Sequence, residues 1–266
     1  MLQYRDDGVV LRTQKLGEAD HIVTLLCRHN GRIRAVAKGV RRTKSKFGGR
    51  LEPFTHVDVL VHPGRSLDVI SQAEVIRPYG APLAGDYPRY TAGTAMLETA
   101  ERFTPMEKEP ALRQYLLLIG GLRTLGETGP DAREPRLVLD AYLLRSLSVA
   151  GYAPALAECA RCGASGVPGA PGVPGASGAP GTPGGKPLVA FAVQAGGMVC
   201  VGCRPPGAAS PSPRTVELMR ALIQGDWDSA MMSERRHRVE CSGLVAAYLQ
   251  WHLEHSIRSL RHVERA

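Results

Sequence analysis

Residues 31–54 read GRIRAVAKGVRRTKSKFGGRLEPF, and we interpret the rest of the chain as organised around them. The stretch opens as a strand, because apolar residues alternate with cationic ones as far as Lys38. A run of cations follows, with no acidic residue before Glu52, and Gly48 and Gly49 add backbone freedom. We therefore expect a flexible basic loop that stands on a strand and meets phosphate groups, with a merely solvated loop as the alternative.

The candidate contacts to nucleic acid are the cations of this strand and loop, together with one aromatic ring that could stack on a base. They are Arg32, Arg34, Lys38, Arg41, Arg42, Lys44, Lys46, Phe47 and Arg50. Phe54 is the other aromatic residue of the stretch, so the surface available for stacking is sparse.

The positive charge of the chain is concentrated in its first part. Residues 1–80 hold fourteen Lys and Arg against eight Asp and Glu, whereas residues 81–203 hold ten of each. This distribution favours a polyanionic partner over a membrane, because no basic amphipathic helix with large apolar residues occurs there. The first ten residues do not have the pattern of a signal peptide, so we expect a cytoplasmic protein whose six cysteines are thiols or metal ligands.

Short strands separated by turn signals fill residues 1–80, which we predict to be one domain. Five strands without helical periodicity favour a small barrel, and the five-stranded OB barrel is the first candidate, with an SH3-like barrel as the alternative. The strands are expected at residues 9–13, 21–27, 32–37, 57–61 and 67–75.

The hydrophobic period changes from two to between three and four from Tyr87 onward, which indicates a helical domain over residues 81–266. Gly120 and Gly121 are expected to break or weaken the second helix. Ser212 is expected to cap a later helix that ends at Gly225. The fold class is therefore α+β, multidomain, with an OB-type barrel followed by helices and an inserted metal hairpin.

Two CxxC pairs occur in the second domain, Cys159 with Cys162 and Cys200 with Cys203. Each pair has the spacing of a zinc knuckle, and two knuckles complete a closed tetrahedral site with no open position for water. We predict one structural Zn²⁺ ion in a module that spans residues 157–205.

The pairs are 37 residues apart, more than the roughly 15–20 expected of a zinc ribbon. Glycine recurs at every third position from Gly166 to Gly184, commonly after proline, and removal of residues 166–185 leaves 17 residues. We therefore interpret 166–185 as an insertion at the tip of a zinc hairpin, extended and disordered. A collagen-like triple helix of three chains is the alternative.

The remaining candidates for chemistry are few. Cys27 and Cys241 have no partner at short spacing and are expected to be buried free thiols. His252 and His255 could share a metal ion, although no third ligand is evident. No phosphate-binding loop, nucleophile elbow or clustered carboxylates are present, which favours binding over catalysis.

The chain resembles the RecO family of bacterial recombination mediators and DNA repair proteins. The resemblance rests on VLR at 10–12, LGEAD at 16–20, residues 22–26, the whole of 31–54, Asp58 and both CxxC pairs. It implies an OB domain that binds single- and double-stranded DNA, a helical domain and a zinc module, in a nucleoid-associated protein that is not an enzyme. It also implies annealing of complementary strands and, with RecR, help to RecA in displacing single-strand-binding protein. The repeat at 166–185 departs from the family pattern.

Two alternatives to this function stay open. One is a zinc-ribbon transcription or assembly factor that works through protein contacts, and the other is a nuclease with a dispersed site. The residues do not indicate which surfaces bind RecR and single-strand-binding protein, what the oligomeric state is, or how much DNA binding belongs to Arg235, Arg236 and Arg238 in the second domain.

Overall fold

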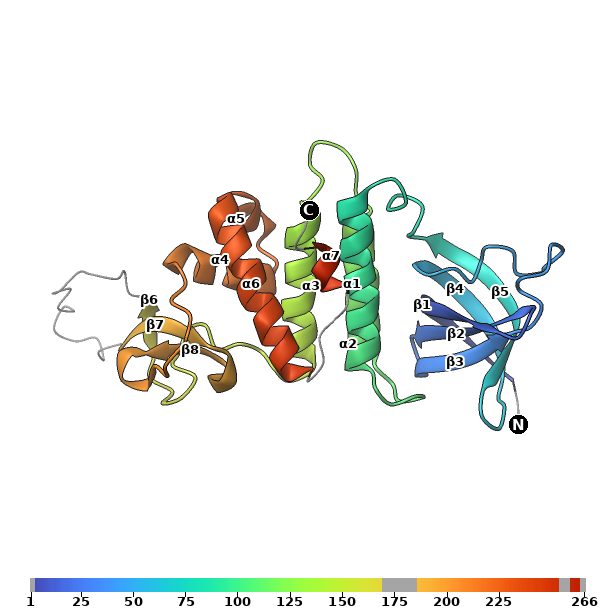
Figure 1. Cartoon of the computed structure of the whole chain (residues 1–266), viewed down its shortest axis with the longest axis horizontal. Helices are drawn as coiled ribbons and strands as arrows, with labels where there is room; N and C mark the ends of the chain where they lie inside the picture. The colour runs from blue at the N-terminus through green and yellow to red at the C-terminus, as the bar shows by residue number, and fades with distance from the viewer. Residues whose placement is uncertain (1–2, 169–185, 254–258, 264–266) are drawn as a thin grey trace. The chain divides into compact units, whose positions relative to one another are not determined.

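The computed structural model describes residues 3–168, 186–253 and 259–263. It divides into two compact units, the first made of Met1–Tyr142 with Ile257–Ala266 and the second of Leu143–Ser256 (Figure 1). The strands of the first unit are β1 (Tyr4–Leu16), β2 (Asp20–Cys27), β3 (Gly31–Ala37), β4 (Thr55–His62) and β5 (Asp68–Pro78).

These five strands form a closed barrel in the order β1-β2-β3-β5-β4. Neighbouring strands are antiparallel except β3 and β5, which run parallel and pair only through Ala35 with Asp68 and Val36 with Val69. The long strand β1 pairs with both β2 and β4 and so closes the barrel. The expected five-stranded OB-type barrel is confirmed.

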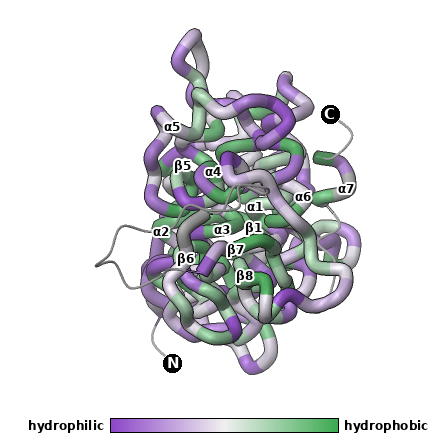
Figure 2. Tube along the Cα trace, turned by 90° about the vertical axis from the view of Figure 1, so that its left-hand side faces the viewer, coloured by the Kyte–Doolittle hydropathy of each residue, from purple (hydrophilic) through white to green (hydrophobic). Residues whose placement is uncertain are grey.

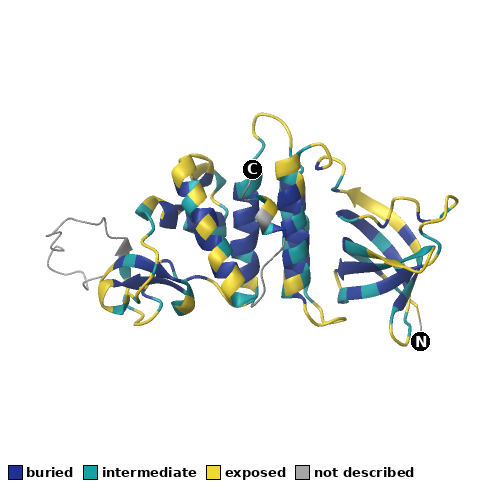
Figure 3. Ribbon diagram, in the orientation of Figure 1, coloured by how far each residue is buried: buried dark blue, intermediate teal, exposed yellow. Residues whose placement is uncertain are grey.

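The interior of the barrel is filled by alternate residues of each strand, such as Val23 and Leu25 of β2 and Ile33 and Ala35 of β3. The outward side of β2 is also buried, since Thr24 and Leu26 have no exposed surface. Helices of the first unit pack against β1 and β2 and cover this side. The C-terminal part of β5, by contrast, is exposed (Figure 3).

The helices that follow are α1 (Tyr87–Phe103), α2 (Leu112–Leu125) and α3 (Pro135–Val149), with the short α7 (Leu260–Val263) packed on α1. The carboxylate of Asp86 caps α1 by accepting from the backbone N–H of Arg89 at 3.0 Å.

The expected break at Gly120 and Gly121 is wrong, because α2 continues through both residues. A β-carbon at Gly121 would lie 3.2 Å from the ring of Tyr142 and 3.3 Å from the sulfur of Met96. The glycine therefore permits close packing, and this packing outweighs the low helix propensity of glycine.

The second unit contains a sheet of β6 (Gly166–Pro168), β7 (Lys186–Ala192) and β8 (Gly197–Cys200), in which β6 is parallel to β7 and β8 is antiparallel to it. All four residues of β8 are buried, and the strand is among the hydrophobic segments in Figure 2. Its helices are α4 (Pro213–Gln224), α5 (Trp227–Met231) and α6 (Arg235–His252).

Two expectations for this unit need correction. Residues 166–168 of the expected disordered insertion form β6, while its remainder, 169–185, lies outside the described residues, as does His255. Ser212 precedes α4, but its side chain makes no capping bond; the carboxylate of Glu240 instead accepts from the backbone N–H of Ser212 at 3.1 Å. Gly225 ends α4 in the left-handed conformation, with φ of 87°.

Candidate nucleic-acid interface and metal centre

The basic loop, defined here as residues 38–54, connects β3 to β4 and is anchored in the barrel. Phe47 is 1% exposed and Leu51 is 2% exposed, and both belong to the hydrophobic core of the barrel. Burial of two side chains of this size stabilises the attachment by several kcal/mol, roughly 1.5–3 for each. The middle of the loop is therefore fixed to the barrel, which corrects the expectation of a freely flexible segment.

The beginning of the loop is fixed to the turn between β1 and β2. The backbone N–H of Gly39 donates to the Asp20 carboxylate at 2.7 Å, and the backbone N–H of Arg41 donates to the carbonyl of Ala19 at 3.0 Å. The Arg41 guanidinium also donates to the carbonyl of Glu18 at 2.9 Å. These bonds hold the first cations of the loop beside that turn.

Six cations of the loop are exposed at the surface, namely Lys38, Arg41, Arg42, Lys44, Lys46 and Arg50. Within the part of the chain that the structure describes, Lys38, Arg42 and Lys44 have no side-chain hydrogen bond or ion pair. Lys46 donates to the carbonyl of Ser71 at 2.8 Å, and Arg50 donates to that of Lys46 at 2.6 Å. The loop thus presents an unneutralised positive surface on a fixed support.

Neither aromatic residue of the stretch offers a face for stacking. Phe47 lies in the barrel core, so its expected place among the base contacts is corrected. Phe54 is 4% exposed, and its ring centroid lies 5.6 Å from that of Tyr90 in α1. Alternation and charge marked this stretch correctly, but they did not distinguish an aromatic anchor from an aromatic contact.

Arg32 and Arg34 lie on the outward side of β3 and already have partners. The guanidinium of Arg32 donates to the carbonyls of Thr104 at 2.6 Å and Pro105 at 2.5 Å. The carboxylate of Glu107 lies 3.8 Å from Arg32 and 3.5 Å from Arg34. Glu107 was not among the residues predicted from sequence, because no local pattern connects it to a strand about 75 positions earlier.

Polar side chains also connect the barrel to α2. The hydroxyl of Tyr115 donates to the Asp7 carboxylate and lies 2.9 Å from Nε2 of His56. Burial raises the pKa of Asp7, but the hydrogen bonds from Tyr115 and His56 outweigh it and hold that pKa below its ordinary value. Burial lowers the pKa of His56 despite the nearby Asp7 carboxylate. This cluster is structural, since its groups satisfy one another inside the unit.

The buried carboxylate of Asp6 lies close to Asp7 and His29, a set that could hold a cation. Its oxygens already accept from the backbone N–H groups of His29 and Asn30 and from the side chain of Asn30 at 2.7 Å. Asp6 therefore stabilises the turn between β2 and β3, and we assign no metal to it.

The four cysteine sulfurs of the CxxC pairs all lie within 4.8 Å of one another. Sγ of Cys162 and Sγ of Cys200 are 3.9 Å apart, close to the roughly 3.8 Å edge of a tetrahedron with Zn–S bonds of about 2.3 Å. The first knuckle turns at Gly163, with φ of 67°, and the second is a 3₁₀ turn over Val201–Cys203. The four cysteines could therefore hold one metal ion, and their geometry fits zinc.

The surroundings of Cys159 favour its thiolate. Burial opposes ionisation, but backbone N–H groups of Cys162, Cys200 and Arg161 lower the pKa of Cys159 to about 6. The N–H of Cys200 lies 3.4 Å from that sulfur. Such donors are typical of a site that binds metal through thiolates.

The other cysteine and histidine candidates do not form a metal site among the described residues. Cys27 and Cys241 are buried and form no disulfide, as expected. His252 stacks on Tyr152 with ring centroids 4.4 Å apart and makes an edge contact with Tyr248. We therefore interpret His252 as a packing residue.

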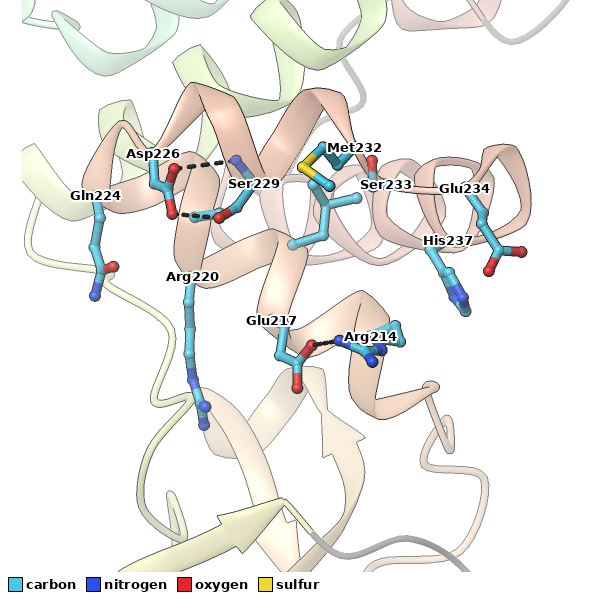
Figure 4. Close-up of a pocket in the computed structure, with 12 residues that line it drawn as sticks. Arg214, Glu217, Arg220, Gln224, Asp226, Ser229, Met232, Ser233, Glu234 and His237 are labelled. Atoms are coloured by element: carbon cyan, nitrogen blue, oxygen red, sulfur yellow. Dashed lines mark hydrogen bonds and ion pairs between the residues drawn. The ribbon is translucent and has the colours of Figure 1, made fainter.

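A cavity of about 620 Å³ lies between α4, α5 and the start of α6 (Figure 4). Several of its charged side chains already have partners. Arg214 pairs with Glu217 at 3.0 Å, and Asp226 accepts from Ser229 and caps α5. Two of the three second-domain arginines named in the sequence, Arg236 and Arg238, are also engaged. Arg236 pairs with Glu234 at 3.0 Å, and Arg238 donates to the carbonyl of Met231 at 2.6 Å. This surface therefore has less unpaired positive charge than the basic loop.

The fold and these two sites define an OB-barrel protein with a cationic loop, a helical part and a four-cysteine cluster that could hold a metal ion. The family model described as "Recombination protein O N terminal" matches residues 1–79, and the one described as "Recombination protein O C terminal" matches residues 84–261. The chain belongs to the RecO family of DNA repair proteins.

Curated relatives agree with this assignment. The chain is 63% identical to a DNA repair protein RecO of Thermobifida fusca over the full length of both chains. It is 56% identical to a DNA repair protein RecO of Streptomyces avermitilis, again with complete coverage of both. A protein of the same name from Frankia casuarinae is 56% identical over 99% of each chain.

Among residues 3–168, 186–253 and 259–263, no helix combines the length and the apolar character needed to span a lipid bilayer.

Proposed function

We propose that this chain is a DNA-binding recombination mediator. It anneals complementary single strands and, together with RecR, assists the loading of RecA onto DNA coated with single-strand-binding protein at the nucleoid. It binds both single- and double-stranded DNA and catalyses no covalent step. The observation that carries the proposal is the set of six exposed cations on a loop that Phe47 and Leu51 fix to the barrel.

This geometry suits a protein that handles strands without reading their sequence. The loop offers ammonium and guanidinium groups to phosphates, and the burial of Phe47 and Phe54 removes the rings that would grip bases tightly. A hold made of phosphate contacts neutralises two strands at once and leaves their bases free to pair. Annealing follows from bringing the strands together with their Watson–Crick edges exposed.

For the metal centre we propose one structural Zn²⁺ ion held by Cys159, Cys162, Cys200 and Cys203. Four thiolates at tetrahedral spacing leave no open position for water, so the ion stabilises the fold of the module and takes no part in chemistry. The functional division that we propose is an OB domain over residues 1–80 and a helical domain over 81–266 that includes the zinc module at 157–205.

The test compares two triple variants of equal charge. One replaces Lys38, Arg42 and Lys44 with glutamine. The control replaces Arg102, Arg113 and Arg123 with glutamine; these are exposed and make no side-chain hydrogen bond or ion pair in the described part of the chain. If six loop cations each neutralise one phosphate, the wild-type salt slope on single strands is about −4, or roughly two and a half decades of affinity between 50 and 200 mM salt.

The salt slope of the loop variant should be about −2, because three of the six cations are removed. This variant should also fail to anneal strands coated with single-strand-binding protein. The control should keep both properties. Equal behaviour of the two triples would contradict the assignment of DNA binding to the loop. Wild-type protein that binds strands but never anneals them would favour the second candidate, a zinc-ribbon assembly or transcription factor, whose supporting observation is the four-cysteine module itself.

A further inference from the structure

The usual oligonucleotide face of an OB barrel is covered over β2 in this protein. OB folds bind oligonucleotides on the face of strands 2 and 3 and through the loops beside it. Here Thr24 and Leu26 on the outward side of β2 have no exposed surface, and Val36 on that side of β3 is 8% exposed. Single-stranded DNA can therefore reach this face only beside or after displacement of the segments that cover it.

Part of the cover is the connection between α1 and α2, residues 104–110, named here the cover segment. It lies along the first half of β3, where β5 makes no pairs (Figure 1). The backbone N–H of Lys108 donates to the carbonyl of Arg32 at 2.8 Å, and Arg32 and Glu107 form a parallel bridge. The cover segment thus adds to the free edge of β3 as a very short strand.

The contact is close enough to constrain the sequence on both sides. A β-carbon on Gly31 would lie only 1.7 Å from the carbonyl oxygen of Glu109, and φ of Gly31 is 61°. Asp68, at the start of β5, holds the other side of the cover segment through an ion pair with Lys108 at 2.9 Å. The backbone of the cover segment is therefore fixed to the barrel.

The side chain of Glu107 is held much more loosely than this backbone. Its carboxylate lies 3.8 Å from Nη1 of Arg32 and 3.5 Å from Nη1 of Arg34, both too long for a strong hydrogen bond, and it is 36% exposed. The contacts are long and the carboxylate is open to water, so they contribute little to stability. The carboxylate can therefore leave without unfolding its support.

The two arginines, in contrast, are prepared for an anion. Carbonyls of Thr104 and Pro105 hold the guanidinium of Arg32 in one orientation and leave its Nη1 for Glu107. In the part of the chain that the structure describes, Nε of Arg34 is a buried donor with no hydrogen-bond partner. A phosphodiester group carries its negative charge on two non-bridging oxygens, so it could accept from both guanidinium groups in place of Glu107.

We propose that Arg32 and Arg34 form a second phosphate site for the backbone of single-stranded DNA, and that the Glu107 carboxylate occupies this site until a phosphodiester group displaces it. The inference rests on the proposed DNA-binding function and adds to it a site at which a carboxylate of the protein competes with DNA phosphate. The strand path then runs from the basic loop onto β3, and Glu107 lowers the affinity of that path in free protein.

The experiment measures binding of an oligothymidylate to full-length protein as a function of salt concentration. Glu107→Gln keeps size and removes the competing charge; Glu109→Gln is the matched control, because Glu109 is exposed on the same segment and its side chain has no partner among the described residues. We expect Glu107→Gln to bind about three- to tenfold more tightly, with a salt slope more negative by about 0.7 for each phosphate gained, while Glu109→Gln resembles wild type.

A second variant identifies the recipient of the phosphate. Glu107→Gln combined with Arg34→Gln should lose the gain and return to the wild-type slope. Thermal unfolding of each variant checks that folding is preserved. Equal affinities and slopes for Glu107→Gln and Glu109→Gln would overturn the second site, as would a gain that persists in the double variant. Failure of the proposed function is a different result, since wild-type protein would then show no binding that depends on the basic loop.

Discussion

Lys108 and Asp68 form an ion pair of 2.9 Å in which the aspartate side chain is 1% exposed and the lysine side chain 50% exposed. The carboxylate also accepts from the hydroxyl of Tyr4 at 3.1 Å and the backbone N–H of Gly64 at 3.1 Å. Asp68 therefore joins β1, β5 and the connection between α1 and α2.

The two partners should differ in their effect on stability. Asp68→Ala leaves three donors without their acceptor and should lower the free energy of unfolding by about 3 kcal/mol. Lys108→Met should cost about 1 kcal/mol or less, since half of the lysine is in water and Tyr4 and Gly64 still serve the carboxylate. Urea denaturation measures both, and equal losses would contradict this division of roles.

His56 should make stability depend on pH. Burial lowers its pKa in the folded protein from the ordinary 6.5, so the unfolded chain takes up a proton first as the pH falls. The stabilising contribution is fully present above about pH 6.5 and is lost as the pH falls from there through the folded pKa. Asp7 beside it titrates in a lower range, because its own pKa is held below 3.8.

Urea midpoints between pH 5 and 7.5 test this prediction. His56→Gln keeps a hydrogen-bonding group near Tyr115 but cannot titrate, so its midpoint should change less over that range than that of wild type. A variant that retains the full wild-type dependence would show that other groups are responsible.

Phe47 should matter for packing rather than for contact with bases. Phe47→Ala should cost about 3–5 kcal/mol, as expected for a fully buried aromatic ring. Phe47→Leu should cost about 1 kcal/mol and leave the affinity for single strands nearly unchanged. Loss of a stacking contact would instead cost about 1–3 kcal/mol of binding free energy in both variants, so fluorescence titration of Phe47→Leu separates the two roles.

Substitution of Gly31 and Gly17 by alanine separates the cost of backbone strain from the cost of steric overlap of the added β-carbon. Both have positive φ, 61° and 56°, but a β-carbon at Gly17 meets nothing within 4 Å, whereas one at Gly31 overlaps the carbonyl of Glu109. Gly17→Ala should cost about 1 kcal/mol from backbone strain alone. Gly31→Ala should cost clearly more, and thermal unfolding that ranks the two in the opposite order would contradict the close approach of the cover segment.

The zinc prediction is tested by metal analysis of protein purified without chelator. Wild type should carry one zinc ion per chain, and Cys203→Ser should carry none and lose order in the module, because the binding free energy of a structural zinc ion contributes to folding. Cys241→Ser is the control, since that thiol is buried away from the cluster. Zinc-free wild type would refute the assignment.

Local patterns predicted much of this molecule from sequence. Alternation placed the five strands, and the 3.6-residue period placed α1 and α3, because each element has one side that must be buried. The same rules failed where the role of a residue depends on a partner that is distant in the sequence. Phe47 resembles a surface aromatic among cations until the barrel closes around it, and Gly121 resembles a helix breaker until Tyr142 packs against it.

The sites show the same division. The CxxC pairs carry their geometry in their spacing, so the four-cysteine cluster could be predicted without any knowledge of the fold. The hydrogen bonds from Arg32 to the carbonyls of Thr104 and Pro105 could not be predicted, because any residue type provides a backbone carbonyl. A run of cations in the sequence therefore indicates which segment contributes to a binding surface. The tertiary contacts determine which of these cations remain available for a ligand.

The pairing of Gly166 with Lys186 has a practical consequence for protein engineering. The backbone N–H of Lys186 donates to the carbonyl of Ser165 at 3.0 Å, and that of Gly166 donates to the carbonyl of Ala157 at 2.9 Å. Lys186 and Gly166 are therefore both hydrogen-bonded within the four-cysteine module. Because the entropic cost of a loop grows only slowly with its length, a guest sequence spliced in here leaves the two knuckles in register. A fluorophore or an affinity tag inserted between Pro168 and Lys186 should therefore leave the four cysteines in place, which metal analysis of the tagged protein would check.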